Sequence, residues 1–217
     1  PDLNDADEWN VVGKLQWEPN DELSVLLKAS RVERDMNCCS PDSVHDPIAD
    51  QAIIARGQPP LGNDPYDHVT SQNTPSPFEQ ESTAASVHID YDAGWGTIES
   101  ISAWDDYDLE SSQEASRSVL DLTFLSQPQS GDSFSQELRF SNSTDNIDYM
   151  AGLYYFTQET SEFEGKGKIS AEIGSDISIG GLIFGAQLPL IVAAGDYGIQ
   201  DSLFETETMA VFGRATW

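Results

Sequence analysis

Apolar and polar side chains alternate in seven stretches of the chain. The clearest stretch is residues 133–141, where Phe134, Leu138 and Phe140 alternate with polar residues such as Glu137 and Arg139. A β-strand sends successive side chains to opposite faces, so this pattern predicts strands with one largely apolar face. The seven predicted strands cover residues 9–18, 23–34, 81–92, 97–109, 133–141, 147–158 and 203–217.

The connections between these stretches fall into two classes. Tight turns rich in Gly, Pro, Asn and Asp are expected near residues 20, 94 and 144. Long connections are expected at 36–80, 110–132 and 161–202, with a short helix at 50–56. Short turns at one end and long loops at the other are typical of outer-membrane barrels. We therefore predict an all-β, antiparallel up-and-down meander, namely a partial transmembrane β-barrel with short periplasmic turns and long extracellular loops. Residues 1–217 form one such region.

The charge and hydropathy of the chain disfavour several classes of partner. The formal net charge is −28, from 10 basic and 38 acidic residues. Such acidity disfavours nucleic acid, whose phosphates require basic side chains, and disfavours attraction to anionic lipid. No apolar run reaches the roughly 18 residues that a transmembrane helix needs, so any membrane crossing is expected to use strands. The chain begins at Pro1 without a signal-like segment, and we expect it to be a mature or excised piece.

The sequence offers little for catalysis or for a resident metal. The adjacent Cys38 and Cys39 are either a strained vicinal disulfide or two ordinary thiols. None of the three histidines has metal-ligand spacing to another, and no Gly-x-Ser-x-Gly nucleophile elbow occurs. We expect no enzymatic activity, no cofactor and no metal site.

Four segments resemble one membrane-protein family. SQELRF at 135–140 and IDYMAGLYYF at 147–156 resemble the mid-barrel hairpin of TonB-dependent outer-membrane receptors. ETMAVFGRATW at 207–217 is similar to the next strand of that family, and LQWEPNDELSV at 15–25 to an earlier periplasmic turn. The resemblance covers about half of the chain and lacks the plug domain. It implies a fragment from the middle of a receptor, whose seven strands leave two edges unpaired.

The resemblance implies a transport function in the outer membrane of a Gram-negative bacterium. The parent receptor would import a scarce ligand, a small molecule or metal chelate such as a ferric siderophore, cobalamin or a glycan. Its partners would be outer-membrane lipid, the rest of the receptor with its plug, and the TonB complex, reached through the missing N-terminal part. The expected ligand-binding residues lie in the lumen or in the first long loop: Asp64, Tyr66, His68, His88, Asp90, Glu137, Arg139 and Asp148.

Two other functions remain open on the sequence. A soluble extracellular β-sandwich for binding or adhesion would bury its apolar strand faces against a second sheet about 10 Å away. Its core would contain Trp17, Leu138, Phe140, Leu153 and Val211. A secreted acidic hydrolase is the weaker alternative, because no catalytic set can be named for it.

Overall fold

Strands dominate the structure of this chain. The computed structural model describes residues 5–37, 47–55, 57, 66, 75–114, 123–161, 169–173, 197–200 and 202–217. One short helix, α1 (Pro47–Ala55), lies where the sequence predicts one. The strands are β1 (Ala6–Asn20), β2 (Leu23–Asn37), β3 (Pro77–Asp92), β4 (Thr97–Glu114), β5 (Thr123–Ser126), β6 (Gln129–Ser143), β7 (Asp148–Ser161), β8 (Ile169–Ile173), β9 (Tyr197–Gln200) and β10 (Leu203–Thr216).

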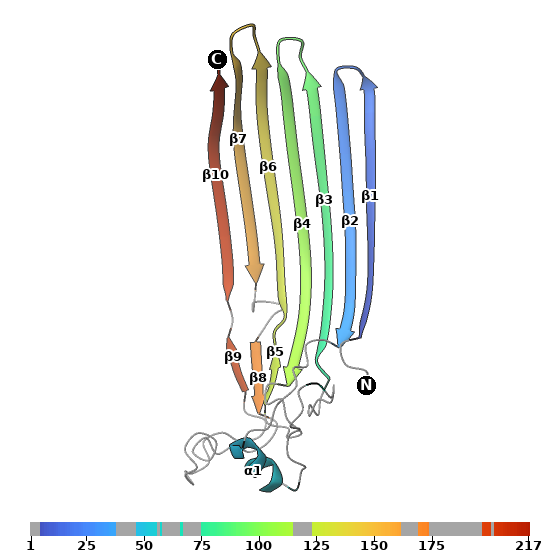
Figure 1. Cartoon of the computed structure of the whole chain (residues 1–217), viewed down its shortest axis with the longest axis vertical. Helices are drawn as coiled ribbons and strands as arrows, with labels where there is room; N and C mark the ends of the chain where they lie inside the picture. Colours follow the sequence, from blue (N-terminus) through green and yellow to red (C-terminus); the bar gives the residue numbers. More distant parts are fainter. Residues whose placement is uncertain are drawn as a thin grey trace.

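Seven long strands lie side by side in the order β1-β2-β3-β4-β6-β7-β10 (Figure 1). Every pairing is antiparallel, and each long strand neighbours the long strands before and after it in the chain. The short strands β5, β8 and β9 continue from the end of β4 that is remote from the tight turns. Among the described strands, β1 pairs only with β2 and β10 only with β7, so the sheet is open. The predicted all-β antiparallel meander is confirmed.

The tight turns occur where the sequence predicts them, and all three lie at one end of the sheet (Figure 1). In the first, Asn20 Oδ1 accepts hydrogen bonds from the backbone N–H groups of Glu22 and Leu23, at 3.0 and 2.9 Å. In the second, Gly94 takes a φ of +76°, which glycine adopts without steric cost. These turns place β1 beside β2, β3 beside β4 and β6 beside β7.

Six of the seven long strands reach further from the turns than the sequence pattern predicts, and β10 begins at Leu203 as predicted. For example, β4 ends at Glu114 rather than at residue 109, and β6 begins at Gln129 rather than at residue 133. Most side chains in these extensions are polar on both faces, with exceptions such as Met36 and Phe78, so the regular apolar alternation disappears there. Strand pairing continues because the ladder uses backbone groups, which do not depend on side-chain polarity.

Strand register defines two faces of the sheet. One row of directly opposed residues crosses all seven strands and is almost wholly apolar: Trp17, Val25, Ile89, Ser100, Leu138, Leu153 and Val211. We call the side that carries this row the apolar face, and the opposite side the polar face. Six residues further from the turns, the same face is mostly acidic, in the row Val11, Arg31, Thr83, Asp106, Asp132, Glu159 and Glu205. The apolar face is thus a band that ends in carboxylates.

No second layer covers this band in the described part of the chain. There, Ile53 of α1 is the only buried hydrophobic side chain. Trp17, Leu153 and Val211 are 57%, 54% and 82% exposed, and Leu138 is exposed as well. The side chains that a sandwich would place in its core therefore lie on an open surface of the sheet. Among the described residues, no helix has the length and apolarity needed to cross a membrane.

Two glycines lie under aromatic rings of neighbouring strands. A Cβ at Gly152 would come within 2.3 Å of the Phe212 ring, and one at Gly131 within 2.8 Å of the Tyr107 ring. Each of these glycines is directly opposite the aromatic residue in the strand register. An aromatic ring laid across a cross-strand glycine covers backbone that a side chain would otherwise cover, and it fixes the register.

Candidate binding site on the polar face

Charged side chains gather on the polar face, next to the tight turns. Asp90 of β3, Glu99 of β4 and Arg139 of β6 are directly opposed in one row. His88 and Glu137 lie on the same face one step further along their strands. Four of the eight predicted ligand-binding residues are therefore neighbours: His88, Asp90, Glu137 and Arg139.

Arg139 lies between two glutamates. Its Nε donates to Glu137 Oε1 at 2.5 Å, two residues away on the same strand. Its Nη1 lies 3.5 Å from Glu99 Oε2 on the neighbouring strand. The shorter bond goes to Glu137, so Glu99 is only loosely held by the guanidinium.

Three donor groups, one imidazole and two carboxylates, converge beside Arg139. The ligand atoms of His88, Asp90 and Glu99 all lie within 4.8 Å of one another. His88 Nε2 is 3.2 Å from Asp90 Oδ1, yet this nitrogen is shielded from solvent and makes no hydrogen bond. An imidazole nitrogen with two carboxylates is a set of donors that divalent transition metals accept.

Sequence reasoning missed Glu99, although a signal for it exists. Asp90 and Glu99 are equally distant from the centre of the turn between β3 and β4. In a hairpin, residues equally distant from the turn are cross-strand partners when the register is regular. Pairing the strands outward from the bond between Gly94 and Trp95 would therefore have placed Glu99 opposite Asp90.

The structure describes two of the remaining predicted ligand-binding residues, Asp148 and Tyr66. Asp148, at the start of β7, accepts a hydrogen bond from the hydroxyl of Ser143. It helps to line a shallow hollow of ≈ 660 Å³ at the tight-turn end, together with Asp92, Tyr149 and Arg214 among others. Tyr66 is exposed. The other predicted residues, Asp64, His68 and the pair Cys38 and Cys39, fall outside the described ranges.

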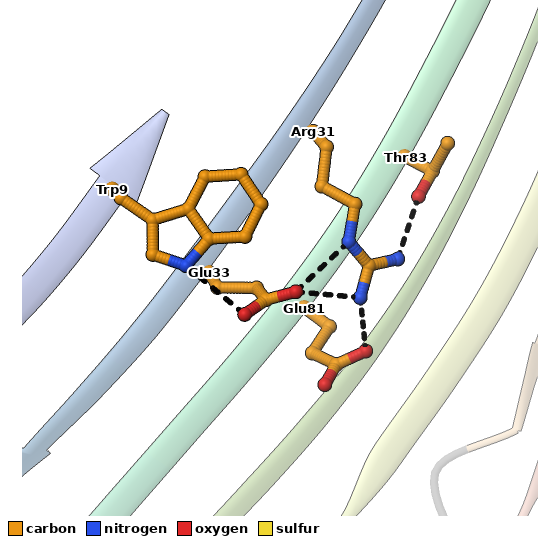
Figure 2. A network of polar contacts seen from close by, with 5 residues as sticks. All are labelled: Trp9, Arg31, Glu33, Glu81 and Thr83. Atoms are coloured by element: carbon orange, nitrogen blue, oxygen red, sulfur yellow. Dashed lines mark hydrogen bonds and ion pairs between the residues drawn. The ribbon is translucent and has the colours of Figure 1, made fainter. Parts of the chain in front are cut away.

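A second polar network, which the sequence did not indicate, joins three strands on the apolar face (Figure 2). Arg31 of β2 donates to Glu33 through Nε at 3.0 Å and to Glu81 of β3 through Nη2 at 2.6 Å. Its Nη1 donates to Thr83 Oγ1 at 3.1 Å. Trp9 Nε1 of β1 donates to Glu33 Oε2 at 3.0 Å. The network lies at the end of the apolar band that is remote from the tight turns, where the band meets the acidic row. An indole in this position places its ring against apolar groups and its N–H against polar ones.

The chain matches no family model, no curated protein and no solved structure.

Proposed function

We propose that this chain is part of the transmembrane β-barrel of a TonB-dependent receptor in a Gram-negative outer membrane. The uncovered apolar band on a seven-stranded antiparallel sheet carries the proposal. Lipid is the partner that makes such a band stable without a second protein layer, because a barrel turns its apolar side chains outward.

The height of the band supports a membrane role. On β1 it runs over nine positions from Trp9 to Trp17, and at β10 over nine positions from Met209 to Trp217. A tilted strand crosses a bilayer in about 9–11 residues. Trp9, Trp17 and Trp217 stand at band ends, where barrels place their aromatic girdles. The acidic side chains beyond the band would then lie in water, outside the hydrocarbon.

The slant of the band gives a second, independent argument. The border of the band that is remote from the tight turns is at Trp9 on β1 but at Met209 on β10. Met209 lies in the same cross-strand row as Leu15. The border thus shifts by six residues, about 20 Å, across six strand spacings, about 29 Å. These lengths correspond to strands tilted by roughly 35° from the normal to the band, and strands of membrane barrels tilt by about 35–45° from the barrel axis.

The receptor assignment itself comes from the resemblance of segments 135–140, 147–156 and 207–217. In such a receptor the polar face lines the lumen, so His88, Asp90, Glu137 and Arg139 face the plug or the passing ligand. The long connections then lie outside the cell and capture a ferric siderophore, cobalamin or a glycan. The TonB complex acts through parts of the receptor beyond this segment.

The deciding experiment compares the expressed chain in buffer, in detergent micelles and in lipid vesicles. We expect monodisperse protein with far-UV circular dichroism of β-strands only in micelles or vesicles. A monomer that is rich in strands and unfolds cooperatively in plain buffer would refute the proposal, because its apolar faces would then have to cover each other. That result would favour the soluble β-sandwich.

A further inference from the structure

We infer that the polar face of the β3–β4 hairpin binds a divalent transition-metal ion through His88, Asp90 and Glu99. The three ligand atoms already lie within 4.8 Å of one another. Donors around one zinc ion, each about 2.0–2.2 Å from it, are separated by roughly 3–4 Å. Small side-chain rotations therefore suffice to bring all three onto one ion.

The hairpin itself assembles the donors. His88 and Asp90 are two residues apart on β3, so strand geometry places both on the polar face. Asp90 and Glu99 are directly opposite each other across the hairpin. The site thus lies within 12 residues of chain, and a single tight turn sets its geometry.

Two features of the hairpin are unfavourable without a cation. Carboxylates directly opposite each other on neighbouring strands repel and destabilise the pairing. In addition, His88 Nε2 is shielded from solvent and lacks a hydrogen bond, which costs free energy. A metal ion between these groups would give the nitrogen a partner and neutralise both carboxylates.

The donor set selects the class of ion. A neutral imidazole suits zinc, cobalt, nickel and copper, whereas calcium and magnesium prefer oxygen alone. The two carboxylates balance the charge of a divalent ion. Three protein ligands leave at least one coordination position for water or an external ligand, as in metal sites that exchange ligands.

The positive charge of Arg139 should repel a metal ion at this site, so its removal gives a sharp test of metal binding. Its guanidinium lies 3.5 Å from Glu99 and has a shorter bond to Glu137 at 2.5 Å. Glu99 can therefore turn to the metal while Arg139 keeps a partner. Removing this positive charge should tighten metal binding by about threefold to tenfold, because Coulomb repulsion between Arg139 and the ion is lost.

The test is titration of the full 217-residue chain with Zn²⁺ by calorimetry and with Co²⁺ by visible absorption. We expect one ion per chain and cobalt bands that Zn²⁺ abolishes. His88→Gln, Asp90→Asn and Glu99→Gln should each weaken binding at least tenfold, and Arg139→Gln should strengthen it. His45→Gln and Asp132→Asn are the matched controls, the first for histidine elsewhere and the second for the acidic row on the apolar face. Both should leave the affinity unchanged.

Absence of a single tight site, or cobalt bands unchanged in His88→Gln, would overturn the inference. Equal weakening by Asp132→Asn would also overturn it, by showing diffuse binding to acidic residues. Circular dichroism of each variant separates loss of ligand from loss of fold. The inference does not rest on the membrane proposal, because the titration is performed in whichever medium the chain folds in.

Discussion

Val211 on β10 gives the sharpest test of what the apolar band contacts. Its side chain is 82% exposed and lies inside the band on that strand, one same-face position from the centre of the band at Gly213. In lipid, Val211→Arg removes about four-fifths of a valine burial worth roughly 1.5 kcal/mol, or about 1.2 kcal/mol. Placing Arg near the midplane costs about 2–4 kcal/mol more. The free energy of unfolding should therefore fall by about 3–5 kcal/mol.

The matched control is Ala210→Arg, one residue earlier on the same strand and on the polar face. Ala210 is also exposed, so both substitutions add the same charge to the same strand. Guanidinium unfolding in lipid vesicles measures both variants. We expect Ala210→Arg to change stability by no more than about 0.5 kcal/mol, which is usual for a surface site. Equal effects of the two substitutions would refute lipid contact, because in water an exposed Val211 is also an ordinary surface site.

Three further substitutions test the local geometry of the sheet, each by denaturant unfolding in the medium that supports the fold. Gly152→Val should destabilise by about 1–3 kcal/mol through overlap with the Phe212 ring, and adding Phe212→Ala should recover part of this loss; additive losses would contradict the packing. Gly94→Ala should cost about 1–2 kcal/mol because of its φ of +76°, whereas Gly13→Ala, with its nearest contact at 3.9 Å, should cost far less. Asn20→Ala should cost about 1 kcal/mol by removing the acceptor for two backbone N–H groups, and Asn20→Asp should be close to neutral; a larger loss in the aspartate variant would exclude this explanation.

The local pattern of residues determined the strands of this protein, the face on which each side chain lies and the tight turns. A period of two in apolar side chains identifies strands and assigns each residue to a face, whatever the strand pairs with. That is why His88, Asp90, Glu137 and Arg139 could be predicted to share a surface. The turn at 93–96 was predictable for the same reason, because glycine and Asx preferences depend on a few neighbouring residues.

Only the tertiary structure decided which residues lie beside one another on each face of the sheet. Residues far apart in the sequence, such as Arg31 and Glu81, meet only through the register between β2 and β3, which a connection of about 40 residues separates. The position of Glu205 beside Glu159 in the acidic row depends in the same way on the register between β7 and β10. A shift of one residue would move every side chain to the other face, and the sequence across a long connection does not specify that shift. Membership of a face is thus a local property, whereas neighbours on that face follow from backbone hydrogen bonds between distant segments.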